Sequence, residues 1–225
     1  RYPRHVVSAT RALDRRILRL ALPAAASSAL QLVHATVDMF WVGQLGTEAL
    51  AALAIATMTV WMFLSIGSLM AIGVTALVAR YVGVGRAHAA AYVTHQGLLW
   101  SVVLGVVVAA LGFALAVPIY RAADAAPAVA QMGVAYTRVF WGAGALMLVQ
   151  IAADAAWRGY GNTRVPLYAG GVALLVNLGL DPLLIHGWGP IPRLGVPGAA
   201  WATVIATVLG VLLVVGVLVR HRRVR

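Results

Sequence analysis

The sequence contains no cysteine and no lysine, and only 10% of its 225 residues are charged. Without cysteine, the chain has no disulfide framework, no thiol nucleophile and no thiolate ligand for a metal ion. Without lysine, it lacks the phosphate loop of nucleotide hydrolases, so active transport would have to be driven by an ion gradient. The histidines form no HExxH pattern. We therefore expect a protein that is not an enzyme and that has no cofactor.

Apolar residues make up 62% of the sequence. A soluble domain of this length could not bury so much apolar surface, so the composition predicts an all-α, polytopic membrane protein whose partner is the lipid bilayer. The net charge of +11 could also suggest a nucleic-acid partner. The arginines, however, lie between the apolar runs and form no single basic patch. Membrane topology explains them better, and we expect no nucleic acid to bind.

Six apolar segments have about the 20 residues that cross a bilayer as a helix. The predicted helices cover residues 18–43, 49–78, 90–118, 131–157, 165–187 and 196–219. They form one transmembrane unit at 18–219, between a basic N-terminal segment at 1–17 and a basic end at 220–225 that we expect to begin a linker. The first residue is Arg1, not Met, and both ends are expected to be cuts through a longer protein.

The arginines divide unequally between the two sides of the predicted membrane. Fourteen lie at the two ends of the chain and in the second and fourth connections, Arg121 and Arg193 lie on the other side, and Arg138 lies close to that side. Because basic residues gather on the cytoplasmic side, we expect both ends of this chain in the cytoplasm and the protein in a bacterial cytoplasmic (inner) membrane. For Arg138 we favour a side chain that extends to the outer interface over a buried ion pair with an acid.

A polar pair interrupts the fifth apolar segment. Asn177 and Asp181 are four residues apart, so they share one face of a helix. A carboxyl group inside a membrane helix costs roughly 2.5–3.5 kcal/mol on insertion scales and suggests a function. Pro182 has no N–H, so the carbonyl group of Leu178 loses its helical donor. Amide, carboxyl and carbonyl oxygens together suit a proton or a small hard cation.

Three polar residues from different segments are predicted at one depth. Asp38, Asp181 and Thr203 each lie six or seven residues from the outer end of their segment, which places them about 9–11 Å below the outer surface. This agreement predicts one shared polar site in the outer half of the bundle. Gln31, His34 and Asp38 follow one stripe of the first helix, so they extend this site towards the middle of the membrane.

Two carboxyl groups in an apolar site resist being charged together, because each loses its hydration and repels the other. Such a pair can hold a proton and release it when a cation arrives, and Na⁺ could compete for the same oxygens. The alternative for Asp38 and Asp181 is a structural hydrogen bond made by a protonated acid. Asp154 lies one turn before Arg158, and for it we favour an ion pair with Arg158 at the cytoplasmic surface.

Four motifs resemble those of one transporter family. Residues 158–166, RGYGNTRVP, look like the R-G-x-G-x-T-x-x-P signature of the multidrug and toxic compound extrusion (MATE) family. Residues 177–187 are similar to its N-x-x-x-D-P-x-x-I-x-G, and residues 194–203 to its L-G-V-x-G-A-A-x-A-T. Leu22-Pro23 and residues 37–46, VDMFWVGQLG, also match its first helix. The resemblance covers essentially the whole chain.

The resemblance implies a secondary active antiporter that exports lipophilic or cationic drugs and toxic compounds in exchange for H⁺ or Na⁺. Family members have twelve helices in two lobes around a central cavity, and this chain resembles the amino-terminal lobe of the prokaryotic DNA-damage-inducible branch. The residues that match the coupling site of that branch, and that would also bind Na⁺, are Asp38, Asn177, Asp181 and Thr203. Ala199 is expected to add a backbone carbonyl, and Gln31 and His34 match cavity-lining positions.

The 225 residues match one lobe of the family, so the C-terminal lobe is missing. The chain is expected either to be a piece of a longer protein, which we favour, or to form a parallel homodimer. Two other functions fit the composition: a lipid-linked oligosaccharide flippase of the same superfamily and a non-transporting membrane scaffold. A flippase would need a more cationic cavity, whereas acids dominate here and Arg138 is the one basic group in the predicted membrane zone. A scaffold would not respond to Asp38→Asn or Asp181→Asn.

Overall fold

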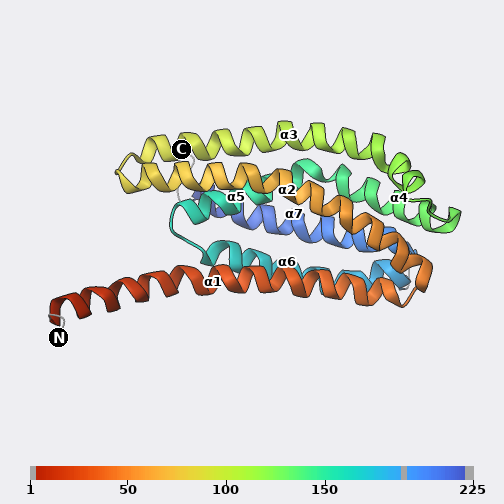
Figure 1. Cartoon of the computed structure of the whole chain (residues 1–225), viewed down its shortest axis with the longest axis horizontal. Helices are drawn as coiled ribbons and strands as arrows, with labels where there is room; N and C mark the ends of the chain where they lie inside the picture. The colour runs from red at the N-terminus through yellow and green to blue at the C-terminus, as the bar shows by residue number, and fades with distance from the viewer. Residues whose placement is uncertain (1–3, 189–191, 221–225) are drawn as a thin grey trace.

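The described part of the chain forms a bundle of α-helices in the computed structural model (Figure 1). The structure describes residues 4–188 and 192–220, and within them the side chains of residues 17, 18 and 20 onwards. The helices are α1 (Arg4–Gly43), α2 (Thr47–Gly83), α3 (Ala87–Ala122), α4 (Pro127–Gly142), α5 (Gly144–Gly159), α6 (Arg164–His186) and α7 (Val196–Arg220).

Five of these helices are long and apolar enough to cross a membrane, namely α1 from Leu20 onwards, α2, α3, α6 and α7. Helices α4 and α5 pass the same test together, as one broken span with a bend of 51°. No strand occurs among the described residues. The predicted all-α, polytopic membrane fold is therefore confirmed, with five spans, or six when the bent pair counts as one.

The fourth predicted helix, residues 131–157, proves to be two helices. The first begins earlier, with Pro127 in its opening turn, where a missing N–H costs little. It ends at Gly142, and α5 begins at Gly144 after the single residue Ala143 (φ −85°, ψ 11°). Glycine on both sides of Ala143 weakens the helix at this point, and the close approach of α3 described below favours the bend.

The remaining predicted ranges differ from the observed helices mainly at their ends. Helices α2 and α3 extend beyond the predicted 49–78 and 90–118 on both sides. The backbone of α1 is already helical from Arg4, so it includes most of the predicted N-terminal segment. The side chains of residues 1–16 and most of the basic end at 220–225 lie outside the described residues, so the predictions for those charges stay predictions.

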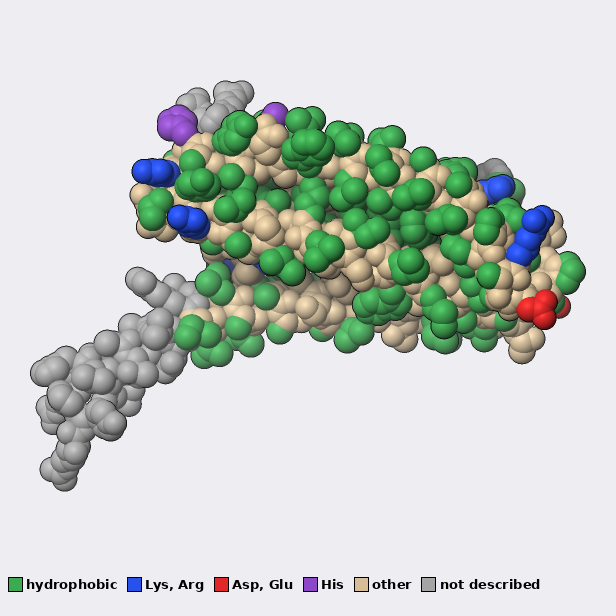
Figure 2. All heavy atoms as spheres, turned by 45° about the horizontal axis from the view of Figure 1, so that its top comes forward, with side chains coloured by type: hydrophobic (Ala, Val, Ile, Leu, Met, Phe, Trp, Pro, Cys, Tyr) green, Lys and Arg blue, Asp and Glu red, His purple; other side chains and the backbone are tan. Residues whose placement is uncertain are grey.

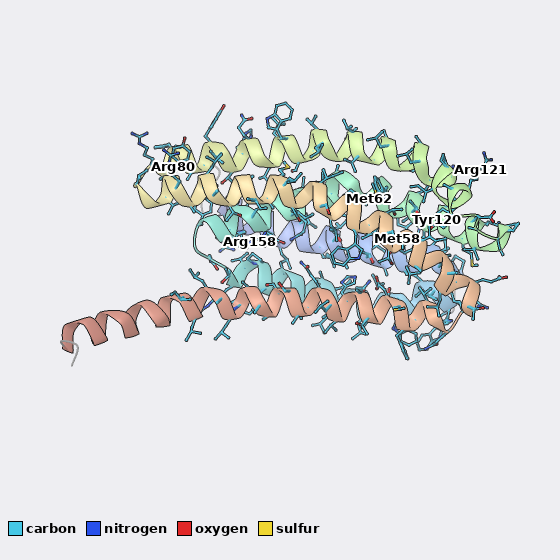
Figure 3. All side chains as sticks on the ribbon, in the orientation of Figure 1. Met58, Met62, Arg80, Tyr120, Arg121 and Arg158 are labelled. Carbon is cyan, nitrogen blue, oxygen red and sulfur yellow. The ribbon has the colours of Figure 1, made fainter. Side chains whose placement is uncertain are left out.

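Arginine side chains lie near the two ends of the bundle. Arg80 and Arg158 lie towards the end at which the described chain both starts and finishes, and Arg121 lies at the opposite end (Figures 1 and 3). Figure 2 shows hydrophobic side chains along the visible face and arginines gathered near its ends. This is the distribution that a membrane-spanning bundle requires, because a charged side chain is costly in hydrocarbon.

The bent pair α4–α5 is packed on several sides. Helices α2 and α3 cover one side of it, and α7 packs against the other. Helix α6 packs against α7, and α1 packs against α6. The core between α2 and α4 contains an aromatic cluster in which Phe63 meets Phe140 and Trp141 edge-on, with ring centroids 5.8 and 5.6 Å apart.

The turn between α5 and α6 is built by the residues of the RGYGNTRVP motif. Gly161 has a φ of 75°, a conformation that favours glycine. The side-chain oxygen of Asn162 accepts hydrogen bonds from the backbone N–H groups of Arg164 (3.0 Å) and Val165 (3.4 Å). It thereby satisfies donors that the first turn of α6 would otherwise leave unpaired. The motif thus sets the direction in which α6 enters the bundle.

Helices α3 and α5 cross at a point where neither has room for a larger side chain. A Cβ atom added at Gly105 would overlap the backbone of Ala145, whose nitrogen would lie 2.7 Å away. A Cβ atom added at Gly144 would lie 3.0 Å from the carbonyl oxygen of Gly105. Small residues therefore permit the close approach of α3 at the bend between α4 and α5.

We expect Gly105→Ala to lower the stability of the protein by about 1–3 kcal/mol, because the added methyl group must push α3 and α5 apart. Gly73→Ala on α2 is the matched control, since nothing lies within 4 Å of a Cβ atom added there. Thermal unfolding in detergent compares the two. The midpoint temperature of unfolding should fall for Gly105→Ala and should stay level or rise slightly for Gly73→Ala. Equal midpoints would contradict the close crossing.

Candidate functional site

Helix α6 carries two polar side chains with no exposed surface, Asn177 and Asp181. The Nδ2 of Asn177 donates a hydrogen bond of 3.3 Å to Oδ1 of Asp181. Their four-residue spacing places them on one face, one turn apart. The helix continues through Pro182 to His186, so the proline does not end it. The pair is therefore held inside the bundle by a continuous helix.

Asp38 of α1 meets this pair from a neighbouring helix. Its carboxyl group interacts with three side chains, those of Asp181, Asn177 and Thr203. Helices α1 and α6 pack together. Leu30 of α1 lies 4.0 Å from the position that a Cβ atom would take at Gly170 or at Gly171. Two carboxyl groups that are far apart in the sequence thus come to face each other.

His34 lies one turn before Asp38 on α1. Its Nε2 is 3.8 Å from Oδ1 of Asp38, which is an ion-pair distance for a protonated imidazole but too long for a hydrogen bond. Both side chains are largely buried, with 24% of His34 and 13% of Asp38 exposed. Gln31, the third residue of the predicted stripe, is exposed. The predicted stripe is therefore exposed at Gln31 and largely buried from His34 onwards.

Helix α7 supplies a hydroxyl group. The Thr203 hydroxyl donates a hydrogen bond of 3.1 Å to the carbonyl oxygen of Ala199, and its oxygen faces Asp38. One turn further along α7, the Thr207 hydroxyl donates to the carbonyl oxygen of Thr203 at 2.7 Å. The Ala199 carbonyl, which the resemblance implies as a contributor, accepts this hydrogen bond from Thr203.

Several buried polar atoms at this site have no hydrogen-bond partner within the described protein, namely His34 Nε2, Asp38 Oδ1, Asn177 Oδ1 and Asp181 Oδ2. Three of them are carboxyl or amide oxygens, which act as acceptors. A buried acceptor without a partner costs about 1–3 kcal/mol. The arrangement therefore favours a ligand that carries positive charge or donates hydrogen bonds, such as a proton or a small cation.

Tyr136 of α4 belongs to the site, and the sequence reasoning missed it. Its side chain is buried and interacts electrostatically with Asp38 and Asp181. Its ring stacks on Phe140, with centroids 6.2 Å apart and planes at 9°. The four-residue spacing to Phe140 predicts only a helical core face. The hydroxyl group was the one signal that could have linked Tyr136 to the buried acids.

Arg138 lies on α4 but away from the acids. It is exposed and forms no ion pair in the described part of the chain. It lines a groove of about 340 Å³ whose other walls are Val117, Ala130, Gln131, Val134 and Ala135. No residue of the acidic site lines this groove, so the buried ion pair considered for Arg138 is not formed.

The predicted ion pair between Asp154 and Arg158 is not formed either. Among the described residues, the one ion pair within 4.0 Å is that of His34 with Asp38. Instead, Asp154 accepts a hydrogen bond of 3.0 Å from Nε2 of Gln150, one turn earlier on α5. Arg158 acts on Asp154 only electrostatically. The Gln150 amide lies within hydrogen-bond distance of the carboxyl group, whereas the Arg158 side chain is exposed.

Within the described ranges, no group of three or more His, Cys, Asp or Glu side chains is arranged to hold a metal ion. The oxygens gathered at the site come from two carboxyl groups, one amide and one hydroxyl, contributed by α1, α6 and α7. These are hard ligands of the kind that suit an alkali or alkaline-earth cation better than a transition metal.

A polytopic bundle with an acidic site between its spans has the architecture of a membrane transporter. The chain belongs to the MatE family, whose model matches residues 23–183. That range includes Asp38, Asn177 and Asp181 and ends before Thr203.

Three curated relatives illustrate the likeness. A FAD transporter of Shewanella oneidensis is 33% identical over 86% of this chain and 43% of its own length. The probable multidrug resistance protein YoeA of Bacillus subtilis is 30% identical over 90% of this chain and 44% of its own length. The probable multidrug resistance protein NorM of Rhizobium meliloti is 32% identical over 91% and 44%. The chain thus spans less than half the length of these relatives.

Solved structures share the fold. A multidrug resistance MATE family transporter of the MOP superfamily in an outward-facing conformation is 25% identical, with a TM-score of 0.85 over 92% of this chain and 45% of that chain. A MOP superfamily transporter from Pyrococcus furiosus is 24% identical, with a TM-score of 0.85 over the same shares. The seven described helices therefore form the fold of one lobe of a MATE-type transporter, as predicted.

Because the two carboxyl groups face each other, the effects of Asp38→Asn and Asp181→Asn on stability should not be additive. We expect the double variant to differ in stability from the sum of the single variants by about 0.5–3 kcal/mol, because the residues interact directly. The control pairs Asp38→Asn with Asp124→Asn, since Asp124 is exposed in the α3–α4 turn. The stability effects of these two control substitutions should add to within about 0.5 kcal/mol. Chemical unfolding in detergent measures both cycles, and additivity in the first would refute the contact.

Proposed function

We propose that this chain is the ion-coupling lobe of a secondary active antiporter that exports lipophilic or cationic compounds in exchange for H⁺ or Na⁺. One observation carries the proposal: the carboxyl groups of Asp38 and Asp181 face each other inside the bundle. Membership of the MatE family and relatives named as probable multidrug resistance proteins support export of drugs.

The site binds one positive charge at a time. With both carboxyl groups ionised, Asp38 and Asp181 repel each other in a poorly hydrated space, and a bound proton or Na⁺ relieves that repulsion. Asn177 and Thr203 hold the carboxyl groups in place. His34 lies beside Asp38 and can add a competing positive charge when protonated. An arriving cation and a bound proton therefore exclude each other.

Transport follows from this exchange. With the lobe open to the cytoplasm, a lipophilic cation binds while the acids are ionised. Rocking against a second lobe exposes the cation to the outside. A proton or Na⁺ from outside then binds Asp38 and Asp181 and displaces the cation. The coupling ion later leaves to the cytoplasm, and its inward movement down the gradient drives export.

The second lobe is a required partner in this proposal. Relatives more than twice as long as the chain support a C-terminal lobe of the same protein over a parallel homodimer. An anionic cargo, suggested by the relative named a FAD transporter or by a flippase activity, has less support. The described site contains no arginine, and Arg138 lines a separate groove.

The proposed location is a bacterial cytoplasmic membrane, with both ends of this chain in the cytoplasm. Because the sequence has no cysteine, single substitutions report the topology directly. We expect Ala123→Cys, in the α3–α4 turn, to react with a membrane-impermeant maleimide on intact cells. Ala87→Cys, at the start of α3, should react only after the cells are opened. The reverse pattern would overturn the orientation.

The exchange itself predicts that a lipophilic cation releases protons from the purified protein. Tetraphenylphosphonium, added to the chain in weakly buffered detergent near pH 7, should acidify the medium. Asp181→Asn should abolish the release, because one of the two facing acids is gone. Glu48→Gln is the control, since Glu48 is exposed at the start of α2, and it should behave as the wild type.

Each other result has a defined meaning. Equal release from the wild type and Asp181→Asn would remove Asp181 from the coupling site. If the cation releases no proton but Na⁺ does, Na⁺ competes with protons at the site and is the coupling ion. Release by neither ligand would overturn the proposal for this chain.

A further inference from the structure

The groove between α3 and α4 contains an arginine that has no acidic partner among the described residues. Its volume is about 340 Å³. Four of its walls are apolar and two are polar; they are Val117 of α3 and Ala130, Gln131, Val134, Ala135 and Arg138 of α4. Arg138 is exposed and forms no ion pair in the described part of the chain. A charged group in such apolar surroundings favours a ligand of opposite charge.

The position of Arg138 along α4 places it near the edge of the hydrocarbon. Helix α3 has 36 residues, which is about 54 Å, so a helix centred in a core of about 30 Å extends about 12 Å beyond it at each end. Helix α4 begins at Pro127, beside the end of α3. Arg138 lies about 16 Å further along α4. Its side chain therefore starts a short distance inside the hydrocarbon and can extend outwards to the lipid headgroups.

Towards the middle of the membrane, the surface beside the groove becomes apolar. Phe113 lies one turn before Val117 on α3 and is 50% exposed. Gly142 lies one turn after Arg138 on α4 and is also exposed. A Cβ atom added at Gly142 would lie 3.1 Å from a ring carbon of Phe113, so the two residues are neighbours across the two helices. A charged group followed by an apolar surface matches the order of groups in a phospholipid.

The charges around the groove favour a headgroup that is negative overall. Arg121, at this end of the bundle (Figure 3), lies one turn after Val117, and Asp124 lies in the α3–α4 turn. With Arg138, the nearby groups have a net positive charge, which repels the ammonium group of a zwitterionic lipid. A guanidinium group matches two phosphate oxygens at once. The amide of Gln131 can bind the hydroxyl groups of a glycerol headgroup.

The groove lies away from the helix that carries the first acid of the polar site. Among the described residues, α1 packs on α2, α6 and α7 but on neither α3 nor α4. Helices α1 and α3 lie at opposite edges of the bundle in Figure 1. In the proposed function, cargo and the second lobe meet the side of α1 on which Gln31 is exposed. The α3–α4 face is therefore left to the lipid.

We propose that the groove between α3 and α4 is a binding site for an anionic phospholipid. The guanidinium group of Arg138 donates hydrogen bonds to the lipid phosphate, and Gln131 binds the glycerol headgroup. One acyl chain lies over Phe113 and Gly142. The proposal goes beyond the proposed function and does not depend on ion exchange, because it concerns a separate surface. A lipid that contacts both α3 and α4 should stabilise the folded bundle.

Thermal unfolding in a neutral detergent tests the site, with phosphatidylglycerol as the added lipid. A ligand that binds the folded protein raises its melting temperature, and the dependence on lipid concentration gives the Kd. Arg138→Gln should weaken the binding of phosphatidylglycerol by about 10–100-fold, the loss expected for a hydrogen bond to a charged group. Its melting temperature without lipid should not change, because Arg138 is exposed.

Further comparisons separate this site from a general effect of surface charge. Arg80→Gln removes an exposed arginine at the opposite end of the bundle, and it should bind the lipid as the wild type does. Ala135→Leu keeps the arginine but fills the groove, so it should weaken binding. Arg138→Lys keeps the charge without the planar fork, and its affinity should be intermediate. Phosphatidylethanolamine, which is zwitterionic, should bind the wild type about fivefold more weakly than phosphatidylglycerol.

Each contrary result overturns the proposal in a different way. Equal losses in Arg138→Gln and Arg80→Gln would attribute binding to overall charge. Equal affinities for the two lipids would refute the preference for an anionic headgroup. If glycerol phosphate, which is soluble, has the same effect as phosphatidylglycerol, the groove binds a free anion and is not a lipid site. If phosphatidylglycerol does not bind, the groove is not a lipid site, and the second lobe becomes its candidate occupant. Proton release, tested with Asp181→Asn, is independent of all these outcomes.

Discussion

The central constraint on this structure is that two carboxyl groups from different helices face each other in a largely buried site. Helix α6 contributes Asp181 and α1 contributes Asp38, so the contact exists only if these helices stay packed. Helix α1 packs along α6, and the capped turn at Asn162 sets the angle of α6. The packing of α1 on α6 and the turn motif thus bring two carboxyl groups together, which costs free energy when both are ionised.

The family motifs divide into residues that build turns and residues that form the site. Gly161 and Gly187 have positive φ angles and shape the ends of α6. Gly198 lets α7 approach the end of α6, since a Cβ atom there would lie 2.5 Å from the carbonyl oxygen of Leu184. Asp181, in contrast, builds no turn, and its burial has a cost that structure alone does not explain. A motif match therefore identifies the fold more directly than the chemistry.

Much of the fold and part of the site could be predicted from the sequence. Hydropathy located the spans because each apolar run matches the bilayer thickness. The predicted depth of Asp38, Asp181 and Thr203 in the membrane placed these three residues at one site. The break at Ala143 could not be predicted, because it depends on how closely α3 crosses. Tyr136 and Gln150 were missed for a similar reason: a tyrosine or a glutamine in a helix has no pattern that shows which neighbour it will meet. The roles of all these residues stay predictions.

The bend at Ala143 joins α4 and α5, the two helices of one broken span. Ala143 keeps main-chain hydrogen bonds in both directions: its N–H donates to the carbonyl oxygens of Val139 and Phe140, and its carbonyl oxygen accepts from the N–H of Met147. The half before the bend carries Tyr136 and the half after it carries Gln150 and Asp154. The bend therefore fixes the angle between the half that carries Tyr136 and the half that carries Gln150 and Asp154, and so the relative placement of these polar groups.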